Sequence, residues 1–269
     1  MDNVLTLAGR LWRWLLPVAV VACLYVQYCY NAHPPAGALS NGQMSARHPT
    51  LLTPAGYAFS IWGVIFSGLL AYTIWQLLPR QRDARLPTRL TPPLTLAVLA
   101  TTAWTLVFSY ELIGWSLLVM LTLLGLLAMC YARARPLVLA NMAPGWPTWF
   151  LSLYLGWIML ATVLNLVFGL RDALGWHLTR QSLISPALVS QLLVVLTGTV
   201  VLLLAWRGRD PLLPLTVAWG LAAVRFANPT SSSAAVYHTA TTALLAAVVL
   251  MLAMPVLLWR QRRLGPRAG

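Results

Sequence analysis

The sequence predicts an all-helical bundle that crosses a membrane about eight times. Hydrophobic residues make up 59% of the 269 residues, charged residues only 9%, and the mean hydropathy is +0.75. A soluble domain carries about a quarter charged residues, so this chain has too few to cover a water-facing surface. Eight apolar runs also approach the ~20 residues that a helix needs to cross ~30 Å of hydrocarbon. The runs are residues 11–30, 56–78, 93–110, 113–131, 149–170, 187–206, 212–227 and 234–259.

The first run resembles a signal peptide because Arg10 and Arg13 stand at its start. It is about 20 residues long and lacks a small-x-small cleavage site, so we expect a membrane span. The third and fourth runs are separated only by residues 111–114, which predicts a tight antiparallel hairpin. A β-barrel would need segments of about ten residues in which apolar and polar residues alternate. The runs in this sequence are longer and apolar throughout.

Proline predicts where helices begin and where connections lie, since it costs little at those positions. We therefore expect Pro34-Pro35, Pro92-Pro93, Pro144 with Pro147, and Pro211 with Pro214 in connections or at helix starts. The polar segment 228–233 is typical of a loop before the last span.

Arginine placement predicts the orientation. Lysine is absent, all eighteen basic residues are arginine, and the net charge is +13. With eight spans and both termini on one side, fourteen arginines fall on that side and only Arg47, Arg171, Arg180 and Arg225 on the other. The positive-inside rule then makes both termini cytoplasmic, in a bacterial inner membrane. The expected partner of the positive charge is the headgroup region of the lipid bilayer, not nucleic acid.

Recognisable catalytic and metal-binding patterns are missing from the sequence. No two carboxylates share a helix face, and Glu111 is the only acid near membrane depth. Apart from His33, which follows Cys29 by four residues, no histidine, His177 included, stands three or four residues from another His, Cys or carboxylate, and a single pair is too few for a helical metal site. The three cysteines lack C-x-x-C spacing, and no nucleotide-binding or serine-hydrolase motif occurs. The sequence therefore predicts no catalytic residue and no metal, and favours a non-enzymatic protein.

Tryptophan is the most informative residue type, with thirteen copies. Several lie near the ends of spans, as in the aromatic belts of membrane proteins. Trp62, Trp104, Trp157 and Trp219 lie further inside four separate runs. They either face lipid and neighbouring helices or form the wall of a pocket for a flat apolar ligand.

Two stretches around these tryptophans resemble the tryptophan-rich sensory protein / translocator protein (TspO/MBR) family. Residues 54–66 are similar to its loop and second helix, with the pattern W-x-F-x-x-x-W-x-x-L-Y after a proline. Phe59 matches this pattern and Trp62 matches its second tryptophan with one residue fewer between them, while Tyr57 stands in place of the first tryptophan and Phe66 replaces the tyrosine.

Two later helices of the family pattern have counterparts as well. Trp104 and Phe108 fit L-N-x-x-W-x-x-x-F, with Thr101 in place of the asparagine. Residues 154–165 closely follow Y-L-x-W-x-x-x-A-x-x-L-N, which is the most specific match. The resemblance covers roughly residues 10–170.

The resemblance implies a five-helix bundle over residues 1–172, with a pocket between helices and a lid formed by residues 31–54. Residues 173–269 would add three further helices and a basic cytoplasmic tail. In the family the pocket accepts porphyrins, sterol-like molecules and synthetic ligands. The residues that match the pocket pattern are Phe59, Trp62, Trp104, Tyr154, Trp157, Ala161 and Asn165.

Three functions follow as hypotheses. The first is a membrane sensory or binding protein for an apolar planar ligand such as a tetrapyrrole or a sterol-like molecule. The second is a small-molecule transporter or channel, suggested by the eight spans and by Asn165, Arg225 and the interior threonines. The third is a membrane enzyme that acts on a porphyrin or lipid. A porphyrin or haem-type molecule is the one cofactor that the resemblance suggests, and formation of a homodimer stays open.

Overall fold

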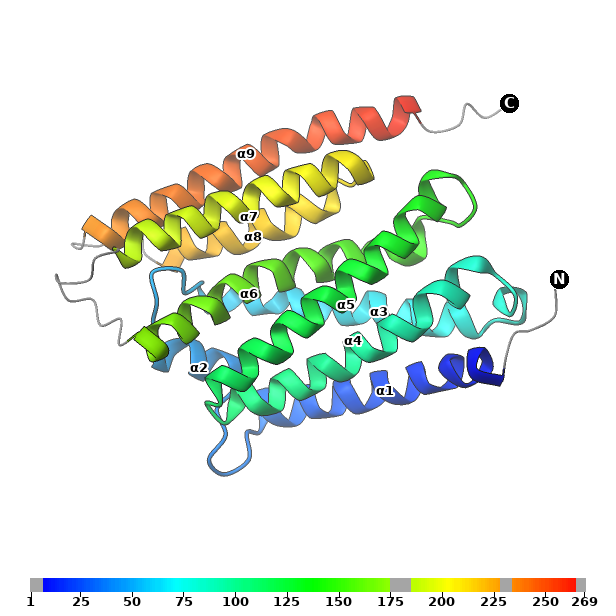
Figure 1. Cartoon of the computed structure of the whole chain (residues 1–269), viewed down its shortest axis with the longest axis horizontal. Helices are drawn as coiled ribbons and strands as arrows, with labels where there is room; N and C mark the ends of the chain where they lie inside the picture. Colours follow the sequence, from blue (N-terminus) through cyan, green and yellow to red (C-terminus); the bar gives the residue numbers. More distant parts are fainter. Residues whose placement is uncertain (1–6, 175–184, 228–233, 265–269) are drawn as a thin grey trace. The chain divides into compact units, whose positions relative to one another are not determined.

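The computed structural model describes residues 7–174, 185–227 and 234–264, and within these residues it contains helices and no strands (Figure 1). The predicted all-α fold class is therefore confirmed. His177, Arg180 and the predicted loop 228–233 lie outside the described residues. The α-helices are α1 (Leu7–Ala32), α2 (Asn41–Arg47), α3 (Ile61–Leu77), α4 (Arg85–Ser109), α5 (Ile113–Leu139), α6 (Trp149–Leu174), α7 (Pro186–Gly208), α8 (Leu212–Ala227) and α9 (Ala234–Leu264). Three short 3₁₀ segments are η1 (Gly56–Ser60), η2 (Pro79–Gln81) and η3 (Trp146–Thr148).

Each of the eight apolar runs forms a helix. Seven segments are long and apolar enough to cross a membrane, and the one shorter apolar helix in the described part of the chain is α8, with 16 residues. At 1.5 Å per residue α8 spans about 24 Å, less than the ~30 Å of the hydrocarbon layer. Many large apolar side chains lie on the outside, such as Val18 and Val21 of α1, which are 67% and 65% exposed. Contact with lipid explains this exposure, which would be costly in water.

The prolines correct one sequence prediction. Pro92 and Pro93 lie inside α4, not at its start, because the helix already begins at Arg85. The first two turns of α4 are too polar for hydropathy to assign to a span, yet Leu86 and Leu90 are almost fully buried. The other predicted proline pairs lie in connections or within the first turn of a short helix.

Internal prolines leave helix carbonyls without their usual backbone donor, and neighbouring helices supply side-chain donors instead. Pro17 of α1 has no N–H for the carbonyl of Arg13, and Gln76 Nε2 of α3 donates to that oxygen at 2.9 Å. In the same way Pro93 frees the carbonyl of Arg89, which accepts from Arg133 Nη1 of α5 at 3.2 Å. Side chains of neighbouring helices thus replace the backbone donors that the two prolines lack.

The chain divides into two compact units, and the first comprises residues 1–41 and 61–155. In it α4 packs against both α1 and α5. Its buried core includes Leu16, Leu69, Tyr72, Leu94 and Phe150. The predicted hairpin between α4 and α5 is confirmed: the chain turns at Tyr110–Leu112, where Glu111 takes a left-handed conformation with φ of 59°.

The second unit comprises residues 42–60 and 156–269. In it α8 and α7 pack against α9, and α8 also contacts η1. Gly156 of α6 lies so close to α8 that a Cβ atom would be 2.9 Å from the carbonyl oxygen of Leu213. Small residues at such positions let membrane helices approach closely.

This close approach predicts that Gly156→Ala destabilises the protein. The added methyl group would meet backbone, which cannot rotate away, so we expect a loss of about 1–3 kcal/mol. Gly125→Ala is the matched control, since a Cβ atom there has nothing within 4 Å and alanine favours a helix. Thermal unfolding in detergent measures both variants. Equal midpoints for the two variants would contradict the proposed packing.

Candidate ligand-binding site

The seven predicted site residues fall into two groups, one in each unit. Each group is described by itself. Trp62, Trp104 and Tyr154 belong to the first unit, and Phe59, Trp157, Ala161 and Asn165 belong to the second.

Tyr154 is the centre of the first group. Its side chain is fully buried, and its ring meets the indole of Trp62 edge-on at a centroid distance of 5.8 Å. Its hydroxyl is hydrogen-bonded to the hydroxyl of Thr101. Thr101 already donates its one hydroxyl proton to the carbonyl of Ala97, so Tyr154 is the donor in this pair. Thr101, which replaces the asparagine of the family pattern, therefore serves as the polar partner of a buried tyrosine.

Trp104 also belongs to the first group. Its ring stacks on Phe108, one helical turn later in α4, at 4.7 Å and 18°. The side chain is 4% exposed, and its indole nitrogen has no hydrogen-bond acceptor among the described residues. A buried N–H without an acceptor costs about 1–3 kcal/mol, and donation of a hydrogen bond to a ligand atom would remove that cost.

Phe59 and Trp157 are brought together in the second group. Their rings meet edge-on at a centroid distance of 6.0 Å, and Trp157 is buried. Ala161 and Asn165 follow Trp157 at intervals of four residues, so all three lie on one face of α6. Asn165 is buried and donates to the carbonyl of Ala161 at 3.2 Å. This face combines a flat aromatic surface, a small residue and an amide.

The segment that leads into η1 is held by α8, which sequence reasoning missed. Trp219 Nε1 donates to the carbonyl of Ala58 at 3.3 Å, and the N–H of Ala55 donates to the carbonyl of Ala223 at 3.0 Å. Tyr57, which stands in place of the family's first tryptophan, packs edge-on against Trp219 at 5.2 Å. The position of Trp219 far inside its apolar run indicated that this residue packs against other parts of the protein. Nothing in the sequence, however, predicts that α8 contacts this segment.

The predicted lid, residues 31–54, contains the short helix α2. Met44 and Leu52 are fully buried, so side chains anchor this connection. In the second unit His48 packs edge-on against Phe168 of α6 at 6.4 Å. A role as a lid stays a prediction.

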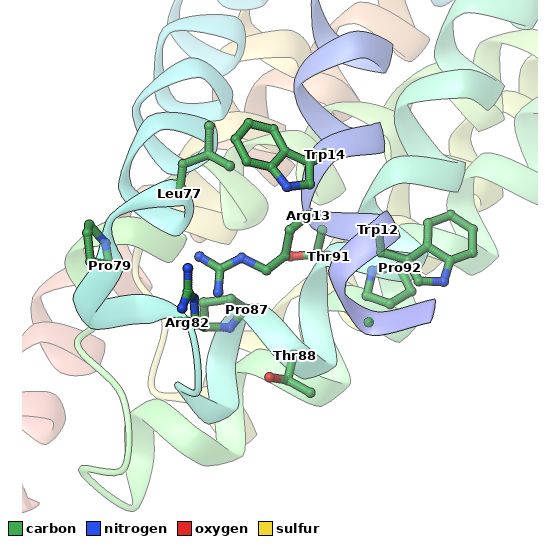
Figure 2. Close-up of a pocket in the computed structure, with 11 residues that line it drawn as sticks. Trp12, Arg13, Trp14, Leu77, Pro79, Arg82, Pro87, Thr88, Thr91 and Pro92 are labelled. Carbon is green, nitrogen blue, oxygen red and sulfur yellow. The ribbon is translucent and has the colours of Figure 1, made fainter. Parts of the chain in front are cut away.

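The first unit contains a cavity of about 220 Å³, and none of the seven predicted residues lines it (Figure 2). Residues from the start of α1, the end of α3, the following turn and the start of α4 line it. Sequence reasoning assigned no site to this end of the helices.

The fold and these apolar and aromatic contacts define a polytopic helical membrane protein, whose surroundings are the lipid bilayer. A family model of TSPO-like proteins matches residues 13–256, so the chain belongs to that family. The match runs from α1 into α9, and it confirms the resemblance found in the sequence. The division at residue 172 stays a prediction. No protein of curated function and no solved structure matches the chain.

The contact between Trp219 and Ala58 predicts a local effect of Trp219→Phe. Phenylalanine keeps an aromatic ring beside Tyr57 but loses the N–H donor, a loss of about 0.5–1.5 kcal/mol. We expect the backbone N–H of Ala55 to exchange with deuterium about twofold to tenfold faster. Trp115→Phe, at a 64% exposed position of α5, is the control and should leave this rate unchanged. An unchanged rate in Trp219→Phe would show that this bond does not hold the segment.

Proposed function

We propose that the protein is a membrane sensory or binding protein that takes an apolar planar ligand, a tetrapyrrole first and a sterol-like molecule second. The observation that carries the proposal is the aromatic face formed by Phe59 and Trp157, continued along α6 by Ala161 and Asn165. An indole ring offers a rigid stacking surface, and a small neighbour leaves room beside it. Membership of the TSPO-like family supports this assignment.

The chemistry of the residues fits a porphyrin-type ligand. Such a ligand presents a large flat face and a few carboxylates, and the matched residues offer aromatic rings and N–H donors. Trp104 contributes a buried indole N–H with no acceptor among the described residues. Trp62, Trp104 and Tyr154 remain predicted ligand contacts on the family pattern.

Two kinds of polar group that suggest a transporter, the interior threonines and Asn165, are bonded to their own helices. The hydroxyls of Thr101 and Thr102 donate to carbonyls of their own helix, those of Ala97 and Val98. Asn165 likewise donates to its own helix. These threonine hydroxyls therefore donate to backbone carbonyls within α4. No contact among the described residues indicates that they line a path for a polar solute.

Titration with protoporphyrin IX tests the proposal. The Soret absorbance of the ligand is followed with the purified full chain in detergent, so loss of a tryptophan does not alter the signal itself. We expect saturable binding. In Trp157→Ala the dissociation constant should rise about fivefold to tenfold, because a stacking surface is lost. Ala161→Leu should weaken binding as well, because it fills space beside Trp157 without opening a cavity.

Trp115→Ala is the control, since Trp115 is 64% exposed on α5. It should bind like the unmodified protein. Unsaturable binding, or the same affinity in Trp157→Ala, Ala161→Leu and the control, would refute the proposal.

We also propose that both termini are cytoplasmic, in an inner membrane. Arginines of three segments assigned to the inside lie near one another in the first unit: Arg13 and Arg82 line one cavity, and Arg133 donates to the carbonyl of Arg89. A fluorescent protein fused to the C-terminus should therefore fluoresce. Alkaline phosphatase fused after Ala36, between α1 and α2, should be active. The opposite pair of results would reverse the orientation.

A further inference from the structure

Two guanidinium groups line the cavity in the first unit. Arg13 comes from the second turn of α1 and Arg82 from the turn that follows η2. Figure 2 shows the two groups next to each other. The residues that line the cavity include these two arginines and no acidic side chain. The cavity therefore carries a net positive charge that an anion would neutralise.

Arg13 is held in position by the packing of α1 against α3. Its guanidinium donates to the carbonyl of Gln76 and, at 3.1 Å, to the carbonyl of Gln81. Gln76 in turn donates to the carbonyl of Arg13, which Pro17 has left without a backbone partner. A guanidinium has five N–H donors, so these two bonds leave three for a ligand. A fixed guanidinium binds an anion with less loss of conformational entropy than a mobile one.

Besides Thr88 and Thr91, the remaining side chains that line the cavity are apolar or aromatic. Trp12 and Trp14 of α1 both line it, and Trp14 is 69% exposed. Tryptophans at the end of a membrane span lie at the depth of the lipid headgroups. Beyond Trp14 the exposed residues Leu15, Val18 and Val21 continue along α1, which provides a surface for an acyl chain.

From this arrangement we propose that the cavity binds the phosphate group of an anionic phospholipid, held by Arg13 and Arg82. Guanidinium groups match phosphate geometry with paired hydrogen bonds, and basic pockets between membrane helices suit such headgroups. A free phosphate ion shares this chemistry, but the exposed Trp14 and the apolar face beyond it indicate a lipid. The proposal is independent of the tetrapyrrole site, which involves none of these residues.

Lipid binding to the purified full chain in a neutral detergent tests the proposal. Native mass spectrometry measures the affinity for phosphatidylglycerol and for zwitterionic phosphatidylcholine, with inorganic phosphate as a competitor in a separate series. Arg82→Gln removes one guanidinium and leaves the bonds of Arg13 to α3 intact. Arg80→Gln is the matched control: it removes the same charge from an equally exposed position nearby that does not line the cavity.

We expect phosphatidylglycerol to bind at least fivefold more tightly than phosphatidylcholine. Arg82→Gln should weaken phosphatidylglycerol binding at least fivefold, and Arg80→Gln less than twofold, with unfolding midpoints unchanged. Equal affinity for the two lipids, or equal losses in the two variants, would overturn the proposal. Inorganic phosphate that binds as tightly as the lipid and displaces it would overturn the lipid assignment and indicate a soluble anion.

Discussion

The hydrocarbon layer offers no hydrogen-bond partners, so every polar backbone group within it needs one from the protein. Three membrane-spanning helices of this chain nevertheless contain internal prolines within the first unit. Two of the carbonyls that these prolines free are satisfied by side chains of neighbouring helices, Gln76 for Arg13 and Arg133 for Arg89. The same bonds fix α1 to α3 and α4 to α5. These bonds lie at the arginine-rich end of the helices, where they link neighbouring helices, and the guanidinium of Arg13 is held in its cavity there.

A second consequence concerns α8. With 16 residues it is the shortest of the apolar helices in the described part of the chain. It approaches α6 at Gly156, and through Trp219 and Ala223 it bonds to the segment before α3 that carries Phe59. Within the second unit α8 thus supports both parts of the proposed ligand wall, the aromatic pair and the face of α6. Of the C-terminal helices, α8 accordingly holds residues of the proposed site in place.

The polar groups near membrane depth can be traced residue by residue. Glu111, the acid nearest to membrane depth, lies in the hairpin turn between α4 and α5. The buried hydroxyls of Thr101, Thr105 and Thr162 donate to carbonyls one turn earlier in their own helices. What the protein presents to a ligand is mainly aromatic surface with a few N–H donors. Such surfaces recognise shape and flatness, which is what the proposed class of ligand offers.

The sequence alone determined the helical membrane fold, the eight apolar helices, the α4–α5 hairpin and the family, because these follow from hydropathy, spacing and local motifs. It also indicated Phe59 and Trp157, which the structure brings together. The family resemblance had implied a single pocket for all seven site residues. The tertiary structure alone decided that Pro92 and Pro93 lie inside a helix, that α8 holds the segment before η1, and that Arg13 and Arg82 share a cavity. These features depend on which distant residue satisfies a polar group or fills a gap. Periodicity within one helix carries no information about that choice.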